Sequence, residues 1–167
     1  MKEKTYESRA YHALFWMYLI VVVRLIIFKY PLAQLVEIAR NWGIEVVKYG
    51  WETANFTFFK TIRMYIDYAY KLNSFENLVG NVVVFIPFGF LLPLVLKKGK
   101  NFLLMFFNTF LFVLGIEVFQ LFSAFGVFDV DDILLNCFGA VIGYLLWRTL
   151  LGVKEEEDVS VFEEQKS

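Results

Sequence analysis

The sequence has few of the residues that several common protein chemistries require. Its single cysteine, Cys137, excludes an internal disulfide and a cysteine-based zinc site. We expect its single histidine, His12, at the membrane surface opposite the acidic residues, so no Ser-His-Asp or Cys-His arrangement can be assembled. The 16 Lys and Arg residues, against 17 Asp and Glu, form no dense basic stripe, which argues against nucleic-acid binding.

Apolar residues are abundant instead. Of the 167 residues, 59% are hydrophobic and 20% aromatic, and the mean hydropathy is +0.57. A soluble domain is roughly 45–50% apolar, and a disordered chain needs low hydrophobicity and high net charge. The composition therefore predicts a membrane protein. A soluble protein with buried core helices is the alternative, but it would leave too little polar chain to cover the apolar segments.

Four segments are long and apolar enough to cross a hydrocarbon core of about 30 Å as helices. They are residues 11–28, 78–96, 102–122 and 132–151. The first could instead be a signal peptide, but its apolar run is longer than the roughly 7–15 residues that such peptides use. We therefore expect an all-α membrane protein in which a bundle of four transmembrane helices forms one domain, residues 1–152. Residues 153–167 form an acidic tail.

The basic residues of the short loops predict the orientation in a bacterial plasma membrane. They precede the first span and occupy the turn between the second and third spans: Lys2, Lys4, Arg9, Lys97, Lys98 and Lys100. The turn between the third and fourth spans has no Lys or Arg and contains Asp129 and Asp131 beside Asp132. We expect both termini, and hence the acidic tail, in the cytoplasm. The loop 29–76 then lies outside despite its six basic residues, at a length near the upper end of the range where the rule applies.

The outer loop is rich in aromatic residues and contains two candidate amphipathic helices. Apolar residues recur at helical spacing over residues 32–49, and the segment 55–70 is rich in Phe and Tyr. Aromatic side chains on an amphipathic helix suit the headgroup region of a bilayer. Both segments are therefore predicted to lie on the outer membrane surface.

With this topology, polar residues of all four spans meet near the outer surface. They are Arg24, Asn77, Asn81, Glu117, Gln120, Asp132 and Asn136. Such groups are costly in hydrocarbon, and one reading is that they only hold the helices together. The other is an outward-facing pocket, completed by Asp129 and Asp131, that binds a cationic or hydroxyl-rich group. We expect no cofactor, although these carboxylates could hold a divalent cation, and Asp132 could instead cap the fourth span.

Three segments resemble the VanZ-like membrane protein family. They are residues 77–93 (NLVGNVVVFIPFGFLLP), the pair Glu117 and Gln120 followed by residues 128–139 (FDVDDILLNCFG), and residues 55–62 (NFTFFKTI). The resemblance covers residues 11–150. It implies a bacterial integral membrane protein of a family linked to resistance to teicoplanin-type lipoglycopeptides. The sequence departs from the family at Phe58, where proline is frequent, and at Gly126, near a frequent arginine. If that arginine pairs with an acid in the family, Asp129 or Asp131 lacks such a partner in this protein.

Three functions fit these observations. The first, which we favour, is a non-enzymatic envelope protein whose pocket binds a lipid headgroup, a cell-wall precursor or a lipoglycopeptide. The second is a membrane-embedded enzyme that uses the Glu and Asp cluster on a lipid-linked substrate. The third is a small transporter or accessory subunit, which would need to form a homo-oligomer, for example through Gly139 and Gly143. Membrane lipids are expected partners in each case.

Overall fold

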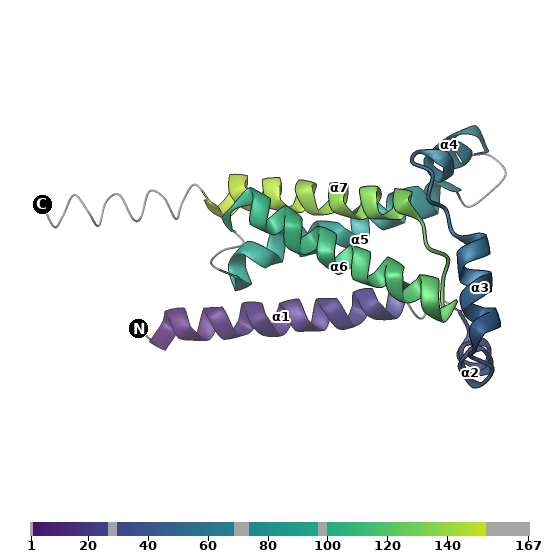
Figure 1. Cartoon of the computed structure of the whole chain (residues 1–167). Helices are drawn as coiled ribbons and strands as arrows, with labels where there is room; N and C mark the ends of the chain where they lie inside the picture. Colours follow the sequence, from purple (N-terminus) through teal and green to yellow (C-terminus); the bar gives the residue numbers. More distant parts are fainter. Residues whose placement is uncertain (1, 27–29, 69–73, 97–99, 153–167) are drawn as a thin grey trace, which may run out of the picture.

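The computed structural model describes residues 2–26, 30–68, 74–96 and 100–152 (Figure 1). Apart from one isolated bridge between Asn55 and Asp129, these residues form only helices and their connections. The helices are α1 (Lys2–Ile26), α2 (Leu32–Arg40), α3 (Ile44–Thr53), α4 (Lys60–Asp67), α5 (Ser74–Val95), α6 (Phe102–Ser123), α7 (Val130–Trp147) and a final π-helical turn (Arg148–Gly152). The predicted all-α fold is confirmed.

The four predicted spans are also confirmed as long apolar helices. Helices α1, α5, α6 and α7 contain windows long and apolar enough to cross a membrane: Arg9–Ile26, Leu78–Val95, Phe102–Ser123 and Val130–Leu151. The four helices run side by side, and α2, α3 and α4 lie across one end of them (Figure 1). We call this end, where α1 and α6 finish and α5 and α7 begin, the loop end. The chain is therefore a multi-pass membrane protein.

Helices α5 and α7 form the tightest pair because glycines bring their backbones into contact. A Cβ atom on Gly89 would lie 1.8 Å from the carbonyl oxygen of Ala140, and one on Gly139 would lie 2.0 Å from that of Val82. Small residues permit this kind of close helix packing in membranes. The sequence predicts that Gly139 and Gly143 let another helix approach, and that helix is α5 of the same chain. This glycine face is therefore filled within the chain.

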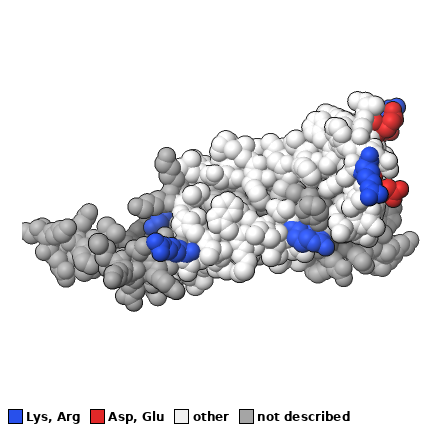
Figure 2. Space-filling view, turned by 90° about the horizontal axis from the view of Figure 1, so that it is seen from below, with Lys and Arg blue, Asp and Glu red and all other residues white. Residues whose placement is uncertain are grey.

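Helix α1 packs more loosely than the other spans. Its buried residues Phe15 and Val22 belong to the apolar core, where Phe15 contacts Phe88 of α5, and the Tyr18 hydroxyl donates to the Val84 carbonyl at 2.9 Å. Only 11% of its span is buried inside the protein, compared with 50% for the last span. Most of α1 therefore presents apolar side chains to its surroundings, as Figure 2 shows for the largely uncharged face of the bundle.

The predicted single helix over residues 32–49 is wrong, because the structure divides it. Helix α2 ends at Arg40, and α3 begins at Ile44. Between them the indole nitrogen of Trp42 donates to the carbonyl of Phe122 at the end of α6, at 2.9 Å. This bond turns the chain toward α6, and Gly43 is a poor helix former. Helix α3 then crosses the end of α6 so closely that Gly50 touches the backbone of Leu121.

The second predicted amphipathic helix is also shorter than expected. Only Lys60–Asp67 of the segment 55–70 is described as helical, and residues 69–70 lie outside the described part. Asn55 pairs instead with the turn between α6 and α7 through its own backbone: its N–H donates to the Phe128 carbonyl, and its carbonyl accepts from Val130. Helical spacing in the sequence does not reveal such a distant partner.

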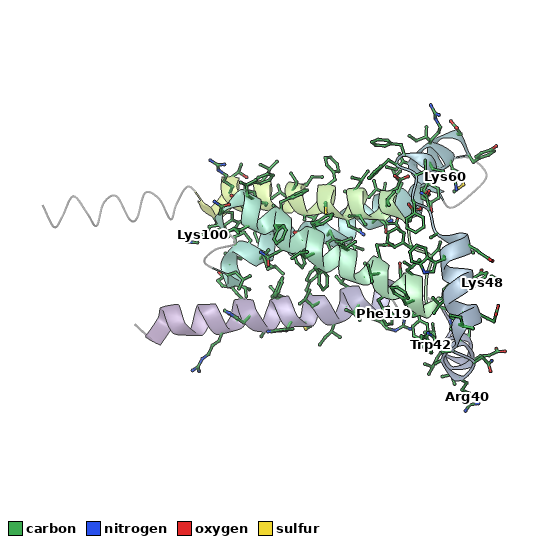
Figure 3. All side chains as sticks on the ribbon, viewed as in Figure 1. Arg40, Trp42, Lys48, Lys60, Lys100 and Phe119 are labelled. Carbon is green, nitrogen blue, oxygen red and sulfur yellow. The ribbon has the colours of Figure 1, made fainter. Side chains whose placement is uncertain are left out.

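Charged side chains gather at the two ends of the bundle. Arg40, Lys48 and Lys60 lie at the loop end, and Lys100 lies at the opposite end (Figure 3). In the view of Figure 2, acidic side chains appear only at the loop end. Lys97, Lys98 and the acidic tail, residues 153–167, lie outside the described residues.

Candidate functional site

Asp129 caps helix α7 and holds residues 55–62, which we call the outer segment, against it. Its carboxylate accepts a hydrogen bond from the N–H of Asp131 at 2.8 Å, which makes Asp129 the N-cap residue. It also accepts from the side-chain amide of Asn55 at 2.8 Å and from the Thr61 hydroxyl. The idea that Asp132 caps the fourth span is therefore wrong, because α7 begins two residues earlier, at Val130.

Asp131 is completely buried and binds the beginning of α4. One carboxylate oxygen accepts from the Phe59 N–H at 2.6 Å, and the other accepts from the N–H groups of Thr61 and Ile62 at 2.8 and 3.2 Å. Phe59 adopts a left-handed conformation, with φ of 62°, as α4 begins. Unsatisfied N–H groups and the helix dipole make this position favourable for an anion. Asp129 and Asp131, which could have lacked an arginine partner, therefore bind neutral hydrogen-bond donors of the chain itself.

Two residues of α6 anchor the neighbouring elements at the loop end. Glu117 is buried, and its carboxylate accepts from the N–H of Asp129 at 2.9 Å. The side-chain amide of Gln120 donates to the carbonyl of Ile26, near the end of α1, at 3.3 Å. Gln120 also packs against Gly126, where a Cβ atom would lie 2.5 Å from the amide nitrogen. Glu117 and Gln120 therefore tie the start of α7 and the end of α1 to α6.

Asn81, Asp132 and Asn136 form a group between α5 and α7, which we call the polar site. The Asn81 amide donates to the Asp132 carboxylate at 2.6 Å, and both residues are half-buried. Asn136 lies one helical turn beyond Asp132 on the same face of α7 and is only 2% exposed. Its side-chain oxygen accepts no hydrogen bond from any residue within the described part of the chain.

Tyr65 of α4 lies near this polar site. Burial raises the pKa of Tyr65 above its ordinary value, and the nearby carboxylates of Asp132 and Asp129 add to the effect. A raised pKa extends the pH range over which the Tyr65 hydroxyl stays protonated and can donate a hydrogen bond.

Two predicted residues, Arg24 and Asn77, remain to be placed. Arg24 is exposed and lines a hollow beside α1 with Trp16, Leu19, Ile20, Val23 and Phe112. Asn77 belongs to α5, but its side chain lies outside the described residues. The remaining predicted residues lie at the loop end: Asn81, Glu117, Gln120, Asp129, Asp131, Asp132 and Asn136.

Sequence reasoning missed the donors of the outer segment. Asn55 and Thr61 bind Asp129, and the backbone of residues 59–62 binds Asp131. Part of the signal was present, because residues 55–62 form one of the segments with a family resemblance. Among the described residues, no group of three His, Cys, Asp or Glu side chains is placed to hold a metal ion. Glu117, Asp129 and Asp131 are positioned by N–H and O–H donors instead.

Comparisons with known proteins agree with the resemblance of three sequence segments to the VanZ-like family. The VanZ/LLP1 family matches residues 15–151, which span all four long helices. A curated relative, "Protein VanZ" of Enterococcus faecium, is 34% identical over 74 residues, or 44% of this chain and 45% of the relative. The chain thus matches less than half of that relative's length. No solved structure gives a significant match. The family match covers most of the sequence, and the chain therefore belongs to the VanZ/LLP1 family.

Proposed function

We propose that this protein is an envelope protein whose loop end faces outward and binds the polar head of a membrane-anchored molecule. The candidates are a lipid headgroup, a cell-wall precursor and a lipoglycopeptide of the teicoplanin type. Its membership of the VanZ/LLP1 family and the partial similarity to the VanZ protein of Enterococcus faecium support a role of this kind.

The observation that carries this proposal is the buried side-chain oxygen of Asn136. Leaving a buried acceptor unsatisfied costs roughly 1–3 kcal/mol, and this acceptor has no donor among the described residues. It lies one turn from Asp132, which is half-buried and bound to Asn81. An amine of a ligand that enters beside Asp132, or two of its hydroxyl groups, would supply donors to both residues.

The roles of the other acids favour binding over acid–base catalysis. Catalysis by paired carboxylates needs two groups whose environments set them apart as acid and base. Asp129 and Asp131 instead hold the outer segment, and Glu117 holds the start of α7. Asp132 is then the carboxylate best placed to meet a ligand.

The outward orientation is supported by basic residues next to the spans at the end opposite the loop end, although the longer loop carries Arg40, Lys48 and Lys60. Arg9 begins the apolar part of α1, and Lys100 lies two residues before α6 at the end opposite the loop end (Figure 3). Basic residues in short loops favour the cytoplasmic side. The polar site would then lie near the outer surface, where cell-wall precursors and glycopeptides are found.

The experiment is to express the protein in a teicoplanin-sensitive bacterium and measure the inhibitory concentration of the antibiotic. We expect the wild type to protect the cells and Asp132→Asn to lose that protection while its membrane abundance, measured by immunoblot, is unchanged. Asp67→Asn, an exposed acid at the end of α4, is the matched control and should protect like the wild type. Full protection by Asp132→Asn would rule out a binding role for the polar site.

A further inference from the structure

A hollow runs along one side of α1 and is separate from the polar site. It has a volume of about 450 Å³ and lies between α1 and α6. Trp16 and Arg24 mark its two ends on α1, about 12 Å apart along the helix axis at 1.5 Å per residue. Between them it is lined by Leu19, Ile20, Val23 and Phe112.

The inner wall of this hollow is fixed. The ring of Phe112 stacks on Phe88 with centroids 5.3 Å apart and contacts Phe85 at 6.2 Å. Phe88 also contacts Phe15 on α1. The outer wall is less constrained, because Trp16 and Ile20 are 63% and 69% exposed. The result is a preformed apolar trough that opens sideways from the bundle, toward the hydrocarbon of the bilayer.

Arg24 places a positive charge at the loop end of this apolar trough. It lies in the last turn of α1, only two residues before the helix ends at Ile26. A long side chain at this position reaches toward the membrane surface, where lipid phosphates lie. The guanidinium group can donate two parallel hydrogen bonds to a phosphate, which makes arginine a preferred phosphate ligand.

We propose that this trough binds an anionic phospholipid, with one hydrocarbon chain along α1 and the phosphate on Arg24. The apolar lining matches the chain, and the cation at one end matches the headgroup charge. A helix of a second copy would fit less well, because its apolar face would bury the guanidinium group against hydrocarbon. The lipid would also fill the gap between α1 and α6 and stabilise the position of α1.

The test is native mass spectrometry of the purified full-length protein in detergent, with phosphatidylglycerol and phosphatidylcholine of identical chains as probes. We expect the wild type to retain phosphatidylglycerol preferentially. Arg24→Gln should weaken phosphatidylglycerol binding about fivefold, a typical contribution of one basic residue near an anionic surface. It should leave phosphatidylcholine binding unchanged. Arg40→Gln is the control, because Arg40 is exposed at the loop end but lies outside the trough.

A second pair of variants tests the trough without changing charge. Ile20→Trp places a large ring in the trough and should reduce phosphatidylglycerol binding. Val21→Trp adds the same ring to the adjacent exposed position, which does not line the trough, and should have no effect. Equal retention of both lipids by the wild type, or equal binding by the two tryptophan variants, would overturn the proposal. Neither readout depends on teicoplanin protection.

Discussion

The side-chain amide of Asn55 donates a hydrogen bond of 2.8 Å to the carboxylate of Asp129, across 74 residues of sequence. The backbones of the same two segments pair as well, with bonds of 2.8 Å to the Phe128 carbonyl and 3.1 Å from the Val130 N–H. Asn55 is buried, and its side chain also binds Thr57 and Thr61. This residue therefore joins the outer segment to the start of α7.

Replacing Asn55 should loosen the outer segment. Asn55→Ala removes the donor to buried Asp129, so we expect the free energy of unfolding in detergent to fall by roughly 1–3 kcal/mol. Residues 30–68 should also become more sensitive to limited proteolysis. Asn41→Ala is the control, because Asn41 is exposed and its backbone rather than its side chain caps α2. Similar stability and proteolysis of the two variants would argue against this role for Asn55.

The glycines of the α5–α7 pair should differ sharply from a glycine of α6. Gly89→Ala places a methyl group 1.8 Å from a backbone oxygen, so the helices must separate. Overpacking of this kind typically costs 1–3 kcal/mol or more. Gly115→Ala meets no atom within 4 Å and should leave thermal stability unchanged or slightly raised. Melting temperatures of the two variants in one detergent provide the measurement, and equal values would contradict the close packing.

The raised pKa of Tyr65 predicts a loss of stability in alkali. The folded protein holds the Tyr65 proton more tightly than the unfolded chain, whose tyrosine has a pKa of about 10.0. Its contribution is therefore complete below pH 10 and is lost as the pH rises through the folded pKa. Melting temperatures at about pH 9 and about pH 11 should fall less for Tyr65→Phe than for the wild type. Tyr68→Phe, at an exposed position of the same segment, is the control.

Cysteine labelling in intact cells tests the outward orientation of the loop end. The only native cysteine, Cys137, is buried and can be replaced by serine. In that background, we expect a membrane-impermeant maleimide to label Lys48→Cys without permeabilisation, because Lys48 is exposed at the loop end. Thr149→Cys, exposed near the opposite end, should be labelled only after permeabilisation. The reverse pattern would place the loop end in the cytoplasm.

The four spans could be predicted from the sequence because length and apolarity are local properties. The break between α2 and α3 could not, since it follows a bond from Trp42 to a carbonyl 80 residues away. The same holds for residues 55–59, whose conformation follows from their pairing with the turn before α7. In both segments, hydrogen bonds to distant parts of the chain determine the conformation, and they override the continuous helix that the spacing of apolar residues predicts.

The candidate site was partly predictable for similar reasons. A common depth in the membrane correctly brought Asn81 and Asp132 together, with Asn136 one turn away. The sequence also suggested that acids at the turn could lack partners, but it could not show backbone donors, which every residue except proline has. Three such donors bind Asp131. A predicted depth in the membrane also does not say which way a side chain points. Arg24 was grouped with the other polar residues by depth, but it lines the trough beside α1.

The most direct test of the polar site is teicoplanin binding to the purified protein in detergent at equilibrium. We expect saturable binding that Asp132→Asn weakens about tenfold, as the loss of one charge-assisted hydrogen bond predicts. Asp67→Asn should bind like the wild type, because Asp67 is exposed at the end of α4. Absence of saturable binding would exclude a lipoglycopeptide as the ligand, and equal affinity for the wild type and Asp132→Asn would contradict the assignment of the polar site as the binding site.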